Sequence, residues 1–281
     1  MKKILFFSII VMLSSCSLFD TFDDVPMYLD IPSVGLSTTT GQGLNTQKIL
    51  DVEVFADGFS VGVFNLPAKV PILSSNESVE ISIFPVIRNN GILSNPVKYP
   101  FYEREDYSFT FEAGEEKLIV PVFKYRSDAF VKLICDFEVG NCITFDFDEN
   151  FDLRFEQSSE TDYGDFCGKI TIEESNTFFE KASFEGIQKS SLTSNIVFLE
   201  MDYRCDNDFG VGLILSGSGE PDFPAYKLVL NKQENWNKIY IEVSQLLVSN
   251  NIESFRVLLG TPTTTTSAGS VWVDNIKLVH F

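Results

Sequence analysis

The sequence predicts an all-β protein made of two sandwiches, an N-terminal immunoglobulin-like sandwich followed by a C-terminal jelly-roll β-sandwich. Three observations predict this fold class. Apolar and polar residues mostly alternate with a period of two, many short stretches of this kind follow one another between turn residues, and the only helical candidate is the stretch 244–250. With 281 residues, 44% of them hydrophobic, the chain can bury one large or two ordinary cores, which excludes wholesale disorder.

The first residues have the pattern of a secretory signal. Lys2 and Lys3 precede the apolar run 4–13 (ILFFSIIVML), which is too short to cross a hydrocarbon core of about 30 Å as a helix. The run ends in Leu-Ser-Ser-Cys at 13–16, which resembles the lipobox of bacterial lipoproteins. The resemblance implies a signal peptide over 1–15 and a mature chain that begins at Cys16, carrying diacylglycerol and an acyl chain. An ordinary secretory signal with a chance cysteine is the alternative.

A lipidated tether is expected over 16–25. Its acidic residues, Asp20, Asp23 and Asp24, are similar in diluted form to the export tethers of surface lipoproteins in Bacteroidota. A flexible anionic tether without an export role is the alternative. We therefore expect a protein held by its lipid in the outer-membrane bilayer, on the cell-surface side, with the periplasmic face left open.

The first sandwich is predicted over 26–126. Alternating residues at 50–54 and 59–63 flank Asp57-Gly58, which tolerates the positive φ of a tight turn, so these segments predict a hairpin. The run 79–87 predicts a further strand. The runs 107–111 and 117–125, on either side of Ala113-Gly114, predict a second hairpin. Six or seven short strands in about 100 residues are typical of an immunoglobulin-like sandwich.

The second sandwich is predicted over 129–281. About ten short strands in 150 residues indicate a jelly roll. The expected strands are 131–137, 142–147, 151–156, 168–173, 196–203, 209–215, 225–230, 238–243, 254–259 and 270–279.

Cysteine use fits an oxidising compartment. With Cys16 reserved for lipid, an even number of cysteines remains for disulfides. They are Cys135, Cys142, Cys167 and Cys205. Three pairings are possible, and free buried thiols are the alternative. Zinc is not expected, because there is no Cys-x-x-Cys pair and no nearby histidine.

Several short motifs carry resemblances to known families. Asp136-Phe137-Glu138 with Gly140, the segment 236–241 (WNKIYI) and the segment 271–278 (VWVDNIKL) are similar to galactose-binding-like, carbohydrate-binding jelly rolls. Nearly the whole chain also resembles a family of uncharacterised Bacteroidota outer-membrane lipoproteins. The residues that carry this second resemblance are 51–58, 66–73, 99–102 and 274–281. It implies a lipid anchor, a sandwich and a jelly roll, without an assigned reaction.

A calcium site is one expectation of the first resemblance. On the last strand, strict alternation places Asp274 on one face with Trp272, Ile276 and Leu278, and a buried carboxylate is costly unless it is paired, hydrogen-bonded or bound to metal. In the resembled jelly rolls, the positions matched by Glu138 and Asp274 meet at a structural calcium, and oxygen ligands suit that ion. The alternative is that Asp274 faces a turn or accepts backbone N–H groups.

Glycan binding requires aromatic platforms beside polar groups. The candidates are Phe178, Phe179, Phe223, Tyr226 and Trp236. The alternative is that they fill cores, since the chain has 27 Phe and Trp236 precedes a predicted strand. The segment 99–102 (YPFY) is expected to form a corner of the first sandwich, with a protein contact patch as the alternative.

Composition excludes several functions. A formal net charge of -19 argues against nucleic-acid binding, and the only histidine, His280, leaves no catalytic triad or histidine zinc site. Asp146, Asp148, Glu149 and Asp152 predict a half-exposed strand with a solvated acidic face rather than a glycosidase pair. We therefore expect no enzyme but an accessory subunit of an outer-membrane β-barrel complex for uptake, secretion or barrel assembly. The alternative is a surface lipoprotein that binds glycans through its C-terminal jelly roll.

Overall fold

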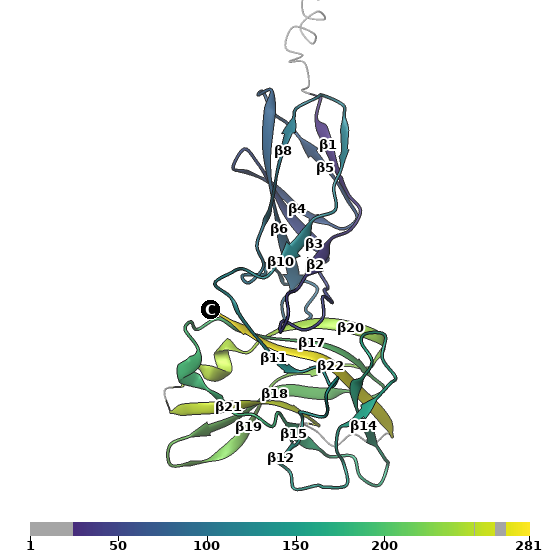
Figure 1. The fold of residues 1–281 in the computed structure, drawn as a ribbon, viewed down its shortest axis with the longest axis vertical. Helices are drawn as coiled ribbons and strands as arrows, with labels where there is room; N and C mark the ends of the chain where they lie inside the picture. Colours follow the sequence, from purple (N-terminus) through teal and green to yellow (C-terminus); the bar gives the residue numbers. More distant parts are fainter. Residues whose placement is uncertain (1–24, 250, 262–267) are drawn as a thin grey trace, which may run out of the picture.

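A computed structural model describes residues 25–249, 251–261 and 268–281, and it confirms the all-β sandwich fold. Two sets of strands, each around its own hydrophobic core, follow one another along the chain (Figure 1). The signal peptide, Cys16 and nearly all of the tether lie outside the described residues. In the described residues, no helix has the length and apolarity needed to cross a membrane.

The N-terminal module contains ten strands. They are β1 (Met27–Ile31), β2 (Gly35–Ser37), β3 (Asp51–Ala56), β4 (Phe59–Asn65), β5 (Ala68–Ile72), β6 (Ser78–Arg88), β7 (Pro96–Lys98), β8 (Glu105–Thr110), β9 (Glu116–Leu118) and β10 (Val122–Lys124). One sheet has the order β4-β3-β6-β7, with β8 also paired to β6. The opposing layer consists of β5-β1-β9 and β10-β2. Burial alternates along β1 and β5, so one face of each strand supplies the core.

One predicted hairpin in this module is confirmed and one is wrong. Strands β3 and β4 pair antiparallel around Asp57 and Gly58, whose φ values of 49° and 82° fit a tight turn. In contrast, β8 pairs with β6, and β9 runs parallel to β1. The turn at 113–114 therefore carries the chain from one sheet to the other. Turn residues alone do not distinguish such a crossing from a hairpin.

In its described residues, the C-terminal module contains twelve strands and two short 3₁₀ helices. The strands are β11 (Phe130–Cys135), β12 (Phe145–Asp146), β13 (Glu156–Ser158), β14 (Cys167–Ile172), β15 (Glu180–Ala182), β16 (Ile187–Gln188), β17 (Val197–Cys205), β18 (Phe209–Gly217), β19 (Glu220–Leu230), β20 (Gln233–Glu242), β21 (Ile252–Gly260) and β22 (Gly269–His280). The helices are η1 (Lys189–Ser191) and η2 (Ser244–Leu247). One sheet has the order β13-β14-β22-β17-β20, with β11 on β22, and the other has the order β12-β15-β21-β18-β19, with β16 on β21.

Strand β22 differs from the alternation expected for it. Asn275 has a φ of 51°, and two residues of β22 oppose one residue of β17 between Asp202 and Glu200, which is a β-bulge. The extra residue turns Ile276 and Leu278 to the interior, where they join the core with Val271 and Val273. The prediction that Trp272, Asp274, Ile276 and Leu278 share one face is therefore wrong.

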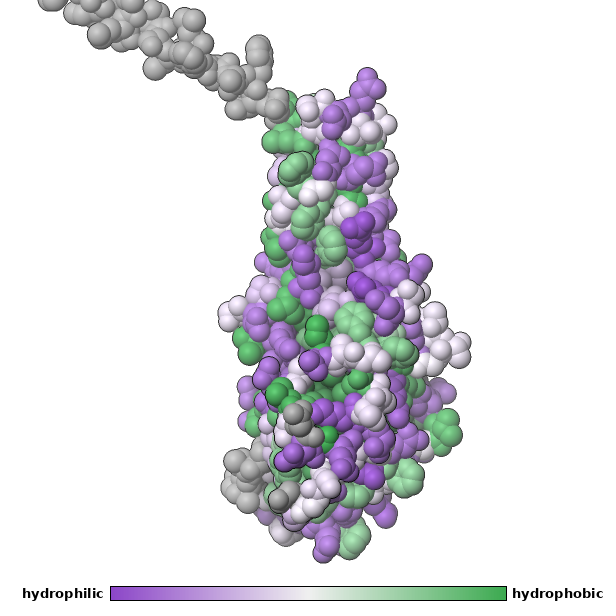
Figure 2. Space-filling model, turned by 90° about the vertical axis from the view of Figure 1, so that its left-hand side faces the viewer, coloured by the Kyte–Doolittle hydropathy of each residue, from purple (hydrophilic) through white to green (hydrophobic). Residues whose placement is uncertain are grey.

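The N-terminal module stands on the sheet that contains β17, β20 and β22 (Figure 1). The ring of Tyr99 lies 5.3 Å from that of Phe198 and 5.0 Å from that of Tyr240. Its hydroxyl donates to Oε1 of the fully buried Glu200 at 2.6 Å, and the hydroxyl of Tyr125 donates to Oε2 at 2.9 Å. The segment 99–102, expected at a corner of one sandwich, is thus buried between two. Figure 2 shows the narrower N-terminal module and the broader C-terminal module from the side, with hydrophilic residues spread over both.

The four cysteines of the C-terminal module are divided between one disulfide and two thiols. Cys135 and Cys142 form a disulfide with an S–S distance of 2.09 Å. Cys167 and Cys205, which the sequence left open for a second bridge, are free and buried. Burial raises the pKa of the Cys167 thiol to about 12 and that of Cys205 to about 11, so both remain protonated and unreactive near neutrality.

Candidate functional site: a cavity at the junction of the two modules

Polar side chains collect on the sheet face that the N-terminal module only partly covers. Along β17, the inward residues Met201 and Tyr203 join the core, so alternation turns Glu200, Asp202 and Arg204 toward the N-terminal module. Asp202 lies opposite Lys238 of β20 and opposite Asp274 of β22. All three side chains are buried. This row of charges runs across the sheet beside the docking surface of the N-terminal module.

A cavity of about 470 Å³ opens over this row. Asp202 and Lys238 belong to its lining, with Trp236 and Tyr163 contributed by the C-terminal module. The N-terminal module contributes residues from β2 and from the loop that precedes β3. The complete lining is Gly35, Leu36, Asn45, Thr46, Gln47, Lys48, Tyr163, Asp202, Trp236, Asn237 and Lys238.

The loop of the N-terminal module is attached to the sheet by polar contacts. The Thr46 hydroxyl donates to Asp202 Oδ2 at 2.6 Å, and Asn275 Nδ2 donates to the same oxygen at 2.9 Å. Leu44 N donates to Asn275 Oδ1, and Lys277 Nζ donates to the carbonyl oxygen of Leu44 at 2.7 Å. These contacts hold one wall of the cavity against its floor.

Three polar atoms of the cavity lining are buried without a hydrogen-bond partner. They are Oδ1 of Asp202, Nε1 of Trp236 and Nζ of Lys238. The Lys238 ammonium has only longer electrostatic contacts, at 3.4 Å to Glu200 Oε2 and 3.8 Å to Asp202 Oδ2. Leaving a buried donor or acceptor unsatisfied costs about 1–3 kcal/mol, and more when the group is charged. All three atoms belong to side chains that line the cavity.

Neighbouring charged groups are strongly affected by burial. Burial raises the pKa of Asp274 to about 8, against the opposing hydrogen bond that Asn275 N donates to its Oδ1. Burial also lowers the pKa of Lys277 to about 7, with the nearby Lys238 charge acting in the same direction. At neutral pH, Asp274 is thus mostly protonated, and the Lys277 charge is partly lost.

The two tryptophans beside this row differ in how they are covered. The guanidinium of Arg204 lies 4.1 Å from the Trp272 ring, Lys169 lies 5.1 Å from it, and Trp272 Nε1 donates to Glu160 at 3.2 Å. Trp236 is half-buried, with Tyr163 packed edge-on at 5.9 Å. Trp236 thus lines the cavity, whereas Trp272 is covered by its neighbours.

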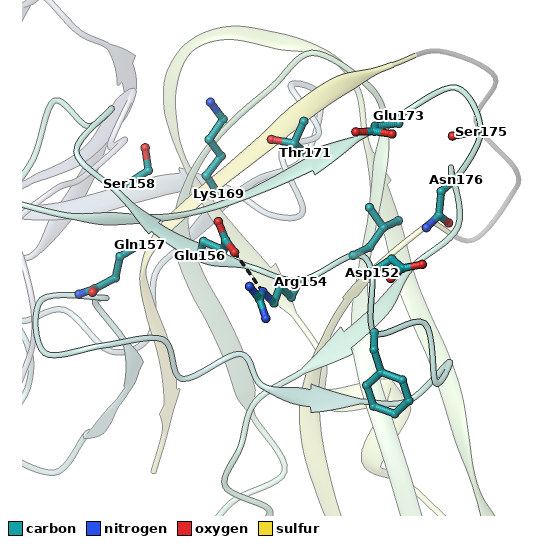
Figure 3. Close-up of a pocket in the computed structure, with 12 residues that line it drawn as sticks. Asp152, Arg154, Glu156, Gln157, Ser158, Lys169, Thr171, Glu173, Ser175 and Asn176 are labelled. Atoms are coloured by element: carbon teal, nitrogen blue, oxygen red, sulfur yellow. Dashed lines mark hydrogen bonds and ion pairs between the residues drawn. The ribbon is translucent and has the colours of Figure 1, made fainter.

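An open hollow of about 740 Å³ lies along β13 and β14, apart from the junction cavity (Figure 3). Lys169, Thr171 and Glu173 project from one segment, and Arg154 pairs with Glu156 at 3.0 Å. Its aromatic residue is Phe151, which is 76% exposed. Within the described chain, none of its lining residues has a buried polar atom that lacks a partner. We therefore regard the junction cavity, rather than this hollow, as the candidate site.

The structure does not bring the five predicted glycan residues together. Phe179 is fully buried in the core, and the Tyr226 hydroxyl donates to Glu180 at 2.9 Å. Phe178 and Phe223 are 39% and 50% exposed but do not line the junction cavity. Only Trp236 lines it, from within β20 rather than before a strand.

Sequence reasoning missed the polar partners of Trp236. The signal for them was present in β17 and β20, where Asp202 and Lys238 lie next to inward apolar residues at positions that alternation turns outward. Tyr163 had no such signal, since it lies in a loop and approaches Trp236 only in the folded chain.

The two predicted calcium ligands, Glu138 and Asp274, differ in how their carboxyl oxygens are hydrogen-bonded. Oε1 of Glu138 accepts hydrogen bonds from the backbone N–H groups of Asp165 and Phe166, at 2.9 and 3.3 Å. Asp274 Oδ2 is buried without a hydrogen-bond partner. In the described parts of the chain, no group of three or more acidic, cysteine or histidine side chains is arranged to hold a metal. Calcium takes roughly six to eight oxygen ligands, so backbone oxygens would have to supply most of them, and the calcium site stays a prediction.

The acidic segment around Asp146 is not a solvated face. Lys181 is buried, and its Nζ lies 2.6 Å from Asp146 Oδ1, 2.7 Å from Asp148 Oδ1 and 2.8 Å from the carbonyl oxygen of Asn150. The predicted solvated face is therefore wrong for Asp146 and Asp148, because a lysine distant in sequence neutralises these two carboxylates. The predicted half-exposed strand is found in β12, and Glu149 and Asp152 are exposed.

Comparisons with known proteins give structural neighbours only. No family model matches the chain, and no curated protein matches it. Among solved structures, the family 30 carbohydrate-binding module of a cellulosomal cellulase of Clostridium thermocellum is 12% identical, with a TM-score of 0.42, over 53% of this chain and 96% of that one. A family 29 carbohydrate-binding module from Piromyces equi is 8% identical, with a TM-score of 0.37, over 55% and 92%.

A third neighbour is the xylan-binding domain of Xyn10C from Paenibacillus barcinonensis. It is 17% identical, with a TM-score of 0.40, over 54% of this chain and 99% of that one. Identity and TM-score are too low in all three cases for a ligand to be transferred. The ligand proposed below is inferred from this chain's own side chains.

Proposed function

We propose that the protein is a non-catalytic saccharide-binding protein and that the sugar occupies the junction cavity. The observation that carries this proposal is that three residues lining one cavity, Asp202, Trp236 and Lys238, each have a buried polar atom without a hydrogen-bond partner in the described structure. Saccharide hydroxyls both donate and accept, so one sugar ring can satisfy a carboxylate acceptor and two nitrogen donors together.

The rest of the lining suits the same ligand. The rings of Trp236 and Tyr163 offer apolar surface for the C–H faces of a sugar, and Asn237 and Thr46 add polar groups around it. The volume of about 470 Å³ lies within the range of roughly 300–1,000 Å³ that is usual for small-ligand sites. Because both modules contribute to the lining, the second sandwich without the first would lack part of the site.

The test is a glycan array probed with the mature protein, followed by titration of each hit against two variants. Trp236→Ala removes a ring that lines the cavity, and we expect it to weaken saccharide binding by about tenfold or more, which corresponds to about 1.4 kcal/mol. Phe223→Ala removes an aromatic ring that is 50% exposed and lies outside the cavity, and we expect it to leave binding unchanged. Equal effects of the two substitutions, or no hit on the array, would contradict the proposal.

We also propose that the protein is an outer-membrane lipoprotein of Bacteroidota type, anchored through Cys16 and displayed at the cell surface. The support is in the sequence, namely the Leu-Ser-Ser-Cys motif at 13–16 and the acidic residues after it. Metabolic labelling with a fatty-acid probe should modify the wild-type protein and not Cys16→Ser, and added protease should digest the anchored protein on intact cells. Labelling of both forms, or protection from protease, would contradict the anchor or the surface location respectively.

The role of accessory subunit of an outer-membrane β-barrel complex ranks second. It depends on the lipid anchor alone, which raises the concentration of the protein near membrane partners. The junction cavity instead supports binding of a small polar ligand. Pull-down of the lipidated protein in mild detergent tests the second role, with a co-purified barrel protein as the supporting result.

A further inference from the structure

A second cavity, of about 300 Å³, adjoins the junction cavity. The two share three lining residues, Lys48, Asn237 and Lys238. The second cavity also lies between the modules, since Arg88 comes from the N-terminal module and Lys232 from the C-terminal one. The two cavities therefore lie next to each other, with Lys48 at their boundary.

The second cavity is basic. Four of its lining residues are cationic and none is acidic, in a chain that has 40 Asp and Glu against 21 Lys and Arg. The four are Lys48, Arg88, Lys232 and Lys238. A local excess of positive charge at such a point attracts anions that the rest of the surface repels.

Two of these cations already have carboxylate neighbours outside the lining. Arg88 Nη1 lies 2.7 Å from Asp51 Oδ2, and Lys238 lies between Glu200 and Asp202. Even so, Arg88 Nε and Lys238 Nζ are buried without a hydrogen-bond partner. Both thus keep donor capacity that their carboxylate neighbours do not use.

The other two cations have little compensation. Lys48 Nζ donates to the side-chain oxygen of Asn237 and forms no ion pair with any described residue. The Lys232 ammonium lies 3.9 Å from Glu234 Oε1, with both side chains exposed, and the backbone N–H of Lys232 donates to Asp208 Oδ1 at 2.9 Å. Lys48 is exposed to solvent at the boundary of the two cavities, and the protein atoms around it lower its pKa by desolvation. An ammonium without a counter-ion among the described residues favours an anionic ligand beside it.

We propose that the saccharide held in the junction cavity carries an anionic substituent, a carboxylate or a sulfate, which binds in the second cavity against Lys48, with Lys232 and Lys238 nearby. This inference rests on the saccharide-binding function proposed above and names the class of sugar. Asp202 fixes the orientation of the saccharide. Its carboxylate accepts hydrogen bonds from sugar hydroxyls and repels an anionic group from the part of the junction cavity lined by Trp236. The neutral ring thus lies at Trp236, and the anionic group lies beyond Lys48.

The experiment uses matched pairs of oligosaccharides that differ only in charge. Galacturonan oligosaccharides are compared with their methyl esters, and sulfated galactan oligosaccharides with their desulfated forms, by titration into the mature protein. We expect at least one anionic member to bind about tenfold more tightly than its neutral partner and this preference to shrink as salt rises. A preference in the first pair identifies a carboxylate, and one in the second pair identifies a sulfate.

Two matched lysine variants separate the local site from the general charge. Lys48→Gln should weaken binding of the anionic member more than binding of the neutral one, and it should thereby remove most of the preference. Lys124→Gln makes the same charge change at an exposed lysine of β10 outside both cavities, and it should leave the preference intact. Equal effects of the two variants would overturn the inference.

The remaining outcomes distinguish this inference from the proposed function. Neutral sugars that bind in a Trp236-dependent manner, without any charge preference, would overturn the anionic substituent and leave the saccharide site standing. Absence of binding by every charged and neutral saccharide would overturn both.

Discussion

The buried carboxylate of Glu200 should link the two modules, and removing one hydroxyl tests this. Tyr99→Phe keeps the ring between Phe198 and Tyr240 but removes the donor that lies 2.6 Å from Glu200 Oε1. A hydrogen bond to a charged group contributes about 1.5–3 kcal/mol. Tyr125 and Lys238 remain near the carboxylate, so we expect a loss of about 2 kcal/mol in the free energy of unfolding.

This loss is measurable by urea or thermal unfolding of the mature protein. For a chain of this size, about 2 kcal/mol corresponds to a fall of roughly 4–8 °C in Tm. Tyr107→Phe is the matched control, because Tyr107 lies on β8 and stacks on Phe109 at 6.0 Å, and it should change stability by less than about 0.5 kcal/mol. Equal stability of the two variants would refute the reasoning that Glu200 couples the modules.

Three further predictions concern buried charges. The folded-state pKa of Asp274 is about 8, well above its unfolded value, so the folded protein binds the proton more tightly and its stability should fall as pH rises from about 4 to about 8. In unfolding titrations at several pH values, Asp274→Asn should flatten this slope by at most about 1.4 kcal/mol per pH unit. An unchanged slope would contradict the prediction. Lys181→Met leaves the partly buried carboxylate of Asp148 uncompensated and should lower the free energy of unfolding by about 3 kcal/mol. Lys132→Met, at an exposed ion pair, should lower it by less than about 1 kcal/mol. Similar losses for the two variants in urea unfolding would contradict the stabilising role of the buried cluster. If Glu138 and Asp274 hold a structural calcium, a chelator should lower Tm and added Ca²⁺ should restore it, and an unchanged Tm would remove the calcium site.

Local sequence patterns predicted the fold where each strand has one buried face. The alternation at 50–63 gave the hairpin of β3 and β4 correctly. It failed at β22, because the bulge at Asn275 inserts one residue and shifts the faces after it, and no alternation rule anticipates such an insertion. It also failed at 107–125, since the choice between a hairpin and a crossing between sheets depends on contacts distant in sequence.

The candidate site was predictable only in part, for the same physical reason. Trp236 was recognised as an aromatic residue beside polar ones. Its partners come from a loop of the same module (Tyr163), from a neighbouring strand (Asp202) and from the other module (Lys48). A cavity formed where two modules meet has no contiguous motif, so its lining could be identified only from the folded chain.

The most direct test of saccharide binding in the junction cavity uses the fluorescence of Trp236 itself. The chain has two tryptophans, so Trp272→Phe leaves Trp236 as the single reporter, and thermal unfolding first verifies that this variant is folded. We predict that a saccharide identified on the array changes the Trp236 emission, with a midpoint equal to the Kd measured by calorimetry. Calorimetric binding without any change in Trp236 emission would contradict the account.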